Sequence, residues 1–397
     1  MREVNPDRGL AFLAGRGKVE AVKVAHIISN LGGGGAETSL FRLVRALPRA
    51  EYRQTVISLS KGGVYPDRLR ALGAEVIELD LRPRLGSFQD LRTLGRALER
   101  NQPDIVQGWM YHGNVLATLY QPIAARGAKV CWNVRQSSAS LKDDKPLTRA
   151  LIVAGGPLSR FCSRIIYNST LSAEQHEARG YAEAKRRIIH NGIDTEEFKP
   201  DAASRERLRD LFKLPTDAVI LGRFGRNTVM KDNRTLLRAF GLLAAKDRRC
   251  HLVAIGRGMS NDDPELARWA SESGAAERVH FSGGHMELPA LMPGFDVNVS
   301  SSGASEGFPN VVAEGMACAV PTVATDIGES RLIIGDPLRI VQPRDPAALA
   351  GAIGAVLALS AEERLAMATR DRARIGEQFS MAAMVAAYVE AWRGCLL

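Results

Sequence analysis

The segment from Glu306 to Glu314 (Glu-Gly-Phe-Pro-Asn-Val-Val-Ala-Glu) combines residue types suited to binding a phosphorylated sugar. Proline suits the first turn of a helix and an apolar run starts at Val311, so we expect a loop that ends in a helix N-terminus. Free backbone N–H groups at such a terminus favour a phosphate. The two carboxylates, one on the loop and one about one and a half turns into the helix, suit hydroxyl groups instead. This combination predicts a nucleotide-sugar site, although an isolated acidic pair of this spacing would more often be structural.

A second segment, Gly225 to Lys231, places Arg226 and Lys231 five residues apart between an expected strand and an expected helix over 235–245. A guanidinium and an ammonium that converge from a strand end and a loop can neutralise a diphosphate. Basic residues beside strand ends are usually solvated, so this segment indicates a diphosphate site only together with the first.

A glycine run, 32–35, lies between an apolar run over 22–28 and an amphipathic segment over 36–44. Glycines let the backbone approach a phosphate or sugar closely, and a plain tight turn is the open alternative. The run is not the G-x-G-x-x-G pattern with a following acidic ribose partner, which argues against a nicotinamide site.

Apolar runs typical of buried strands alternate with helical patterns along the chain, which predicts α/β architecture with doubly wound parallel sheets. The first series of expected strands covers 22–28, 54–59, 103–107, 129–134, 164–167 and 187–190. The second covers 219–224, 251–255, 278–282, 296–300, 321–324 and 339–341. Two such domains in tandem leave a cleft at the carboxyl ends of their strands, where ligands of these folds bind.

Composition narrows the class of protein. A length of 397 residues favours two domains. No run of 18 apolar residues occurs and the first twenty residues lack a signal-peptide core, so we expect a loose tail and a cytoplasmic protein. The five cysteines have no C-x2-C spacing, so neither a disulfide framework nor a zinc site is predicted.

The net charge of +9 lies entirely in the first half, where residues 1–200 hold 30 basic and 20 acidic residues. No motif supports nucleic acid as a partner. An anionic surface at the inner face of the cell membrane, or an anionic lipid-linked substrate, fits the basic half better. Simple solubility charge is the open alternative.

The order of these segments resembles that of the retaining nucleotide-sugar glycosyltransferases of family 4. The motifs that carry the resemblance are Gly33-Gly34-Gly35-Ala36-Glu37, Asn191-Gly192-Ile193-Asp194, Gly225-Arg226…Lys231 and Glu306-x7-Glu314. The resemblance covers residues 22 to about 392. It implies the GT-B architecture, in which two Rossmann-like domains face each other across a cleft. We expect a disordered tail over 1–20, an acceptor-binding domain over 21–200, a nucleotide-sugar-binding domain over 201–378, and a C-terminal helix over 379–397 that packs back towards the N-terminal domain.

The resemblance also implies roles for single residues. Arg226 and Lys231 match the pair that grips the donor diphosphate and stabilises charge on the departing nucleotide. Glu306 matches the residue that contacts hydroxyls of the transferred sugar, and Glu314 the residue that holds the ribose. The remaining donor-binding positions are Gly307, Phe308, Pro309, Asn310 and Val311 beside the sugar and phosphates, and Gly33, Gly34 and Gly35 in a loop that closes over the phosphate. The segment 279–284 resembles the strand and loop beside the nucleobase.

One part of the chain departs from the family pattern. A histidine often follows the Pro-Asp-Ile-Val strand near the reacting sugar, and here Trp109 and His112 stand at the two candidate positions. Gln136 stands where related enzymes often have histidine after the next strand. We take His112 as the residue of the sugar site, and a core or solvent-facing histidine is the open alternative.

The expected reaction is therefore transfer of a hexose-type sugar, from a UDP-sugar by preference, to a glycan or lipid-linked acceptor in surface polysaccharide biosynthesis. The chain has no D-x-D motif to hold a metal-bound diphosphate, so we expect no metal and no cofactor. A catalytically silent sugar-nucleotide-binding subunit and a sugar-nucleotide epimerase on the same fold are the alternatives.

Overall fold

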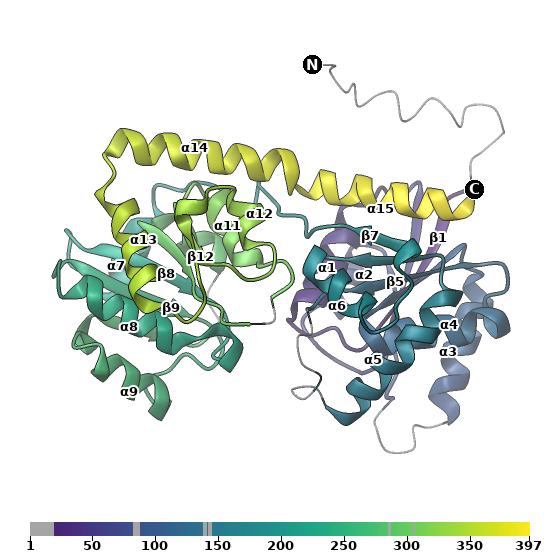
Figure 1. The fold of residues 1–397 in the computed structure, drawn as a ribbon. Helices are drawn as coiled ribbons and strands as arrows, with labels where there is room; N and C mark the ends of the chain where they lie inside the picture. The colour runs from purple at the N-terminus through teal and green to yellow at the C-terminus, as the bar shows by residue number, and fades with distance from the viewer. Residues whose placement is uncertain (1–19, 82–87, 138–140, 142–144, 285–286, 305) are drawn as a thin grey trace. The chain divides into compact units, whose positions relative to one another are not determined.

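The computed structural model describes residues 20–81, 88–137, 141, 145–284, 287–304 and 306–397 (Figure 1). The tail expected over residues 1–20 lies outside the described residues, apart from Glu20. The chain divides into two compact units. The first consists of Met1–Asn133, Leu158–Arg164 and Trp392–Leu397, and the second of Val134–Pro157 and Ile165–Ala391. The domain limits expected at residues 200 and 378 stay predictions.

Two parallel sheets form the centre of the fold, which confirms the expected α/β architecture. The first has the strand order β3-β2-β1-β4-β5-β6-β7, with β1 (Val22–Ile28), β2 (Tyr52–Ser58), β3 (Glu75–Glu78), β4 (Ile105–Trp109), β5 (Lys129–Val134), β6 (Arg164–Tyr167) and β7 (Arg186–Ile188). The second has the order β10-β9-β8-β11-β12-β13, with β8 (Val219–Phe224), β9 (Cys250–Ile255), β10 (Val279–Ser282), β11 (Val297–Ser300), β12 (Thr322–Thr325) and β13 (Ile340–Val341).

Helices connect the strands, as parallel pairing requires. In the first half these are α1 (Gly35–Ala46), α2 (Pro66–Ala71), α3 (Phe88–Asn101), α4 (Met110–Ala124), α5 (Pro146–Leu158) and α6 (Thr170–Glu177). In the second half they are α7 (Ser204–Phe212), α8 (Asn233–Ala244), α9 (Pro264–Glu272), α10 (Leu288–Leu291), α11 (Asn310–Ala317), α12 (Ser330–Ile334), α13 (Pro346–Ala358), α14 (Ala361–Gln378) and α15 (Met381–Leu396). No single helix of the described chain has the length and apolar content of a membrane span, and only α13 and α14 together, bent by 111°, meet those criteria by length and composition.

Alternating side chains of the second sheet build two hydrophobic cores, one on each face. Ile220 and Val253 point into a core shared with α7, α11 and α14. Their neighbours Leu221 and Ala254 point into a core shared with α8, α9 and α13. This explains why these strands are apolar throughout rather than alternately polar, since both faces are covered. Figure 1 shows the helices of this unit on both sides of the sheet.

Each sheet has a point at which the strand order reverses, and these points determine where the predicted site residues lie. In the first sheet β1 pairs with both β2 and β4, and in the second β8 pairs with both β9 and β11. Ligands of doubly wound folds bind outside the carboxyl ends of the strands at such a reversal. The glycine run follows β1, and α4 follows β4. The segment 225–231 follows β8, and the loop that contains Glu306 follows β11.

Candidate functional site

The loop after β8 presents the two predicted cations from a defined backbone. It starts at Gly225, whose φ of 139° is accessible to glycine and strained for other residues. A short 3-10 turn, Val229–Lys231, then leads into α8. Asp232 caps α8 by accepting a hydrogen bond from the Thr235 N–H at 3.1 Å. Because the cap fixes the start of the helix, it also fixes the backbone from which Lys231 projects.

Lys231 and Glu306, 75 residues apart in sequence, form an ion pair through Nζ and Oε1. Both side chains are half-buried, with 22% and 17% of their surface exposed. The Ser302 hydroxyl donates to the same Oε1 at 2.9 Å, and the Ser301 hydroxyl donates to the Lys231 carbonyl at 2.9 Å. Among the described residues none donates a hydrogen bond to Oε2 of Glu306. One carboxylate oxygen therefore orients the lysine, and the other is open to a hydroxyl group.

Arg226 differs from Lys231 in its surroundings. Its side chain is exposed and makes no ion pair or hydrogen bond with any residue that the structure describes. Its guanidinium is therefore available to an anion, and it lies on the same loop as Lys231.

Arg223 is a component of this site that sequence reasoning missed. It lies in β8, is only 2% exposed, and donates through Nη1 to the Gly225 carbonyl and through Nη2 to the Arg226 carbonyl at 3.2 Å. Burial lowers the pKa of Arg223 to about 10, and the negative charge of Glu306 opposes that shift. The guanidinium thus remains charged at neutral pH, and its hydrogen bonds fix the backbone of the loop. An arginine within the otherwise apolar sequence Val-Ile-Leu-Gly-Arg-Phe was the available indication, because a buried charge requires partners.

The backbone around Glu306 and Gly307 is held tightly. The Ser137 hydroxyl donates to the Glu306 carbonyl at 2.9 Å, and the Glu329 N–H donates to the Gly307 carbonyl at 2.9 Å. A Cβ at Gly307 would lie 2.6 Å from Oδ1 of Asn168. A Cβ at Gly328 would lie 2.3 Å from the Gly307 carbonyl oxygen. Glycine is therefore required at both positions for the chain segments to approach.

The helix expected after Pro309 is confirmed as α11, with Pro309 at the N-cap. Asn310 accepts a hydrogen bond on Oδ1 from the Asn191 side-chain amide at 2.6 Å, which connects two of the predicted motifs. The Val311 carbonyl accepts from Asn298 at 2.9 Å. Glu314 lies four residues into the helix and is 5% exposed.

Phe308 lies in the hydrophobic core rather than at a surface. It is 5% exposed, and its ring centroid lies 5.7 Å from that of His190 and 5.5 Å from that of Phe379. Its ring therefore anchors the loop, which leaves the backbone as the part able to face a ligand.

The remaining predicted residues lie in the first unit. Gly34 is the N-cap of α1, and a Cβ there would lie 2.4 Å from a carboxylate oxygen of Glu37. His112 lies in the first turn of α4 and is half-buried, and burial lowers its pKa, which favours the neutral imidazole. Trp109 is fully buried and donates to Nδ1 of His26 at 3.1 Å, so it belongs to the core. Of the two candidate positions, only His112 is partly accessible.

The expected nucleobase segment forms β10 and the turn after it. β10 pairs with β9, and Gly256 directly after β9 has a φ of 156°. A Cβ at Gly256 would lie 2.0 Å from the Gly225 carbonyl oxygen. The carboxyl ends of β8 and β9 therefore approach each other with no side chain between them, which leaves space beside these strand ends.

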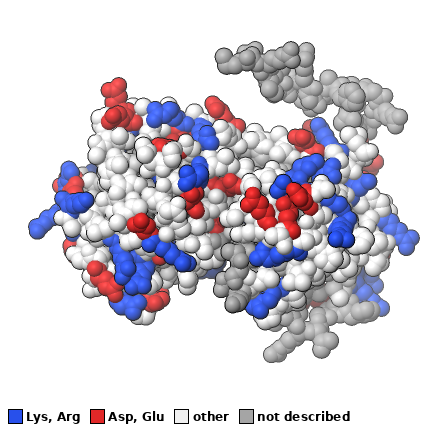
Figure 2. Space-filling model, in the orientation of Figure 1, with Lys and Arg blue, Asp and Glu red and all other residues white. Residues whose placement is uncertain are grey.

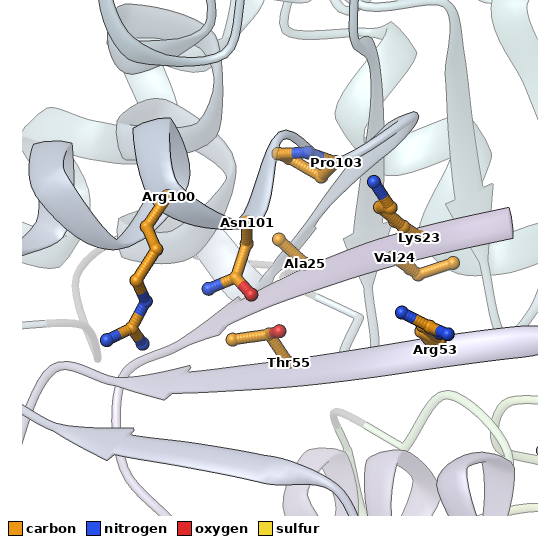
Figure 3. Close-up of a pocket in the computed structure, with 8 residues that line it drawn as sticks. All are labelled: Lys23, Val24, Ala25, Arg53, Thr55, Arg100, Asn101 and Pro103. Carbon is orange, nitrogen blue, oxygen red and sulfur yellow. The ribbon is translucent and has the colours of Figure 1, made fainter.

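A separate small pocket lies in the first unit, at the amino-terminal ends of the strands of its sheet (Figure 3). Its walls come from the first residues of β1 and β2 and from the end of α3, with Lys23, Arg53 and Arg100 among them. Arg100 is paired with Glu75. The pocket lies at the amino ends of the strands, away from the reversal of strand order where ligands of such folds bind.

Comparison with known proteins identifies the family. Residues 33–197 match the model of Glycosyltransferase Family 4, and residues 215–358 match that of Glycosyl transferases group 1. The chain belongs to glycosyltransferase family 4. Among relatives of this family, EpsF of Bacillus subtilis, itself named as a proposed glycosyltransferase, is 25% identical over 77% of this chain and 79% of its own length. The D-inositol 3-phosphate glycosyltransferase of Mycolicibacterium smegmatis is 30% identical over 57% of this chain and 53% of its own length.

Solved structures of similar fold include HepE of Anabaena in complex with UDP and glucose, with a TM-score of 0.81, 20% identity and coverage of 94% of this chain and 100% of HepE. The sucrose-phosphate synthase of Thermosynechococcus elongatus has a TM-score of 0.75 at 20% identity, covering 94% of this chain and 98% of the synthase. At these identities the likeness establishes the fold, and the expected GT-B architecture is confirmed.

Proposed function

We propose that this family 4 glycosyltransferase transfers a hexose-type sugar from a nucleoside diphosphate sugar to a glycan or lipid-linked acceptor, with retention at the anomeric carbon and without a metal. The observation that carries the proposal is the Lys231–Glu306 ion pair at the carboxyl ends of β8 and β11, with Arg226 on the same loop and α11 beginning after Glu306. This arrangement brings cations, a hydroxyl-binding carboxylate and a helix N-terminus into one site.

Each group has a role in breaking the bond between the anomeric carbon and the diphosphate oxygen. Negative charge gathers on the phosphate in the transition state, and Arg226, Lys231 and the N-terminus of α11 stabilise it. The free Oε2 of Glu306 accepts a sugar hydroxyl, and Glu314 holds the ribose. The acceptor oxygen attacks the face from which the diphosphate leaves, and its proton passes to a phosphate oxygen. The absence of a D-x-D motif supports neutralisation by protein cations instead of a metal.

Of the possible donor nucleotides, we favour UDP. HepE was solved with UDP, with UDP and glucose, and with UDP-glucose. A relative in Mycolicibacterium smegmatis, 32% identical over 42% of this chain and 46% of its own length, is named as a GDP-mannose-dependent mannosyltransferase. The nucleobase is therefore the part of the donor that an assay must decide.

We place the acceptor at the inner face of the cell membrane, as part of surface polysaccharide synthesis, on the basic balance of residues 1–200. Basic and acidic side chains are interspersed on the face seen in Figure 2, so the placement depends on the basic balance of residues 1–200 and not on one continuous patch. Attachment through this charge would be screened by salt and reversible. Recovery in the membrane fraction at low salt and release at high salt are expected. Recovery in the soluble fraction at low salt would contradict peripheral attachment.

The test is a screen of UDP-, GDP-, ADP- and TDP-sugars with purified protein in EDTA, with release of the nucleoside diphosphate as the readout. We expect one donor to be consumed slowly alone and faster with an extract of lipid-linked saccharides. An Arg226→Gln variant serves as the control for the site. Binding of a nucleotide sugar without turnover would favour a silent subunit, and isomerised sugar nucleotide without released diphosphate would favour an epimerase.

A further inference from the structure

The second unit has a pocket of its own beside the loop that presents Lys231. It has a volume of about 840 Å³ and is bounded by three segments. These are the loop and first turns of α8 (228–238), the backbone at Gly303 and Ala304, and the turn that starts α13 at Pro346. A volume of this size accommodates a small organic molecule. None of the residues given a donor role above lines this pocket, although Thr228, Val229 and Met230 lie between Arg226 and Lys231 in the sequence.

Three arginines from two different elements line the pocket. Arg234 and Arg238 lie one turn apart on α8, and Arg344 precedes α13. All three are exposed, and none makes an ion pair or hydrogen bond with another residue that the structure describes. Arg344 reaches over the backbone at Gly303, where its Nε lies 3.7 Å from the position of an added Cβ.

Other arginines of the same unit are neutralised by carboxylates. Arg205 pairs with Asp296 at 3.0 Å, Arg331 with Asp326 at 2.5 Å, and Arg339 with Asp371 at 2.5 Å. Arg226 and Arg248 also lack a carboxylate partner among the described residues, so the distinguishing feature of this pocket is that three such guanidinium groups line one concavity. Such a cluster retains its full capacity for an anion.

The charge of the pocket indicates the kind of anion. Asp232 is the only carboxylate among the lining residues, and both of its oxygens accept hydrogen bonds from Thr235, at 3.1 and 2.7 Å. Three arginines against one aspartate give the lining a charge of +2. A phosphate monoester carries about −1.5 to −2 at pH 7, and its oxygens match the fork of a guanidinium. A carboxylate or a phosphodiester would leave about half of this charge unpaired.

The rim of the pocket suits the organic part of such a ligand. Val229 is 97% exposed and Met230 is 42% exposed, although both are apolar. These side chains lie directly before Lys231 and can cover apolar surface of a molecule whose phosphate contacts the arginines.

From these features we infer that the pocket binds a second ligand through a phosphate monoester group, held by Arg234, Arg238 and Arg344. The ligand is either a soluble phosphate ester or the headgroup of a phosphomonoester lipid, which share this chemistry. The site is separate from the diphosphate contacts assigned to Arg226 and Lys231.

Occupancy of the pocket is coupled to the donor site through backbone hydrogen bonds. The Gly303 N–H donates to the Met230 carbonyl at 2.8 Å, and the Lys231 N–H donates to the Thr228 carbonyl at 2.9 Å. A ligand that contacts Val229 and Met230 therefore acts on the same short turn that positions Lys231. We expect a change in the apparent KM for the donor when the pocket is filled.

The test measures binding of inorganic phosphate by ³¹P NMR line broadening in full-length protein. All variants carry Arg226→Gln, which weakens phosphate binding at the donor cations equally in each of them. Addition of Arg238→Gln and Arg344→Gln is expected to weaken phosphate binding at least tenfold. The matched control, Arg248→Gln, removes an exposed arginine outside the pocket and is expected to change nothing. Equal phosphate binding in the pocket variant and the control would overturn the inference.

A second arm separates the two sources of the phosphate. Flotation with phosphatidylcholine vesicles that contain phosphatidic acid is compared with vesicles that contain phosphatidylserine, which has a phosphodiester. Flotation that requires phosphatidic acid and is lost in the pocket variant assigns the site to a lipid headgroup. Loss of phosphate binding without any vesicle dependence assigns it to a soluble ester. Both results support the site, and neither depends on turnover of a nucleotide sugar.

Discussion

Replacing Arg223 with methionine removes the two side-chain hydrogen bonds that fix the backbone of the loop after β8. The methionine fills much of the same space and introduces no new polar group. The variant leaves the carbonyl groups of Gly225 and Arg226 without their buried donor. The loop that carries Arg226 is then free to shift.

The size of the effect follows from these two contacts. A hydrogen bond from a charged donor contributes about 1.5–3 kcal/mol. Two such bonds are lost, but methionine also avoids the cost of burying a charge, so we expect a net loss of unfolding free energy of about 2 kcal/mol. If the shifted loop costs one contact between Arg226 and the donor phosphate, kcat/KM falls roughly 10- to 150-fold.

The assay is a double-mutant cycle with Arg226→Met, using the donor that the wild-type protein consumes. Because Arg223 acts through Arg226, the double variant should have a kcat/KM within about twofold of Arg226→Met alone. Arg223→Lys keeps the charge but lacks the fork, so it should give an intermediate loss. Fully multiplicative effects of the two methionine substitutions would refute the positioning role.

Three further predictions concern stability. Gly328→Ala should destabilise the fold and lower turnover, because its φ is 58° and its Cβ would lie 2.3 Å from a carbonyl oxygen of the site loop. The control Gly274→Ala, with a φ of 72° and open space, should cost only about 1–2 kcal/mol, and equal losses would contradict this. Asp371→Asn should lower the unfolding free energy by up to about 3–5 kcal/mol, because buried Arg339 then keeps only Asp336, on its Nε, as an ion-pair partner; a loss below about 1 kcal/mol would argue against it. His26 is fully buried and its pKa is lowered to about 4, so the unfolded chain takes up a proton near pH 6.5 before the folded one does. Urea midpoints should therefore fall as the pH falls from 6.5 to 4, and less steeply in His26→Gln; an unchanged slope in the variant would exclude this cause.

Much of the fold follows from apolar periodicity. The strands expected over 129–134 and 164–167 match β5 and β6. The strand expected over 187–190 ends two residues beyond β7, and those of the second sheet match within about one residue at each end. β3 was missed because it is a short edge strand, Glu-Val-Ile-Glu, with no fully buried residue. Periodicity identifies strands covered on both faces more readily than half-exposed ones.

The part of the site that could be predicted consists of residues that directly follow expected strands. Lys231 and Glu306 each follow a strand at the reversal of strand order, and they form an ion pair. The roles of these residues toward a donor stay predictions. Support from distant segments was not predictable, because nothing in the sequence indicates that Ser137 or Gly328 contacts the backbone near Glu306. Arg344 likewise joins Arg234 only through the packing of α13 against α8.

Arg226 and Lys231 are proposed to grip the terminal phosphate of the donor nucleotide. Calorimetry in EDTA tests this role by comparing the Kd of the nucleoside diphosphate with that of the nucleoside monophosphate. The wild-type protein should bind the diphosphate at least about tenfold more tightly, since each charge-assisted contact contributes about 1.5–3 kcal/mol. The preference should nearly disappear in the Arg226→Gln and Lys231→Gln variants. An undiminished preference for the diphosphate in both variants would show that these two cations do not hold the terminal phosphate.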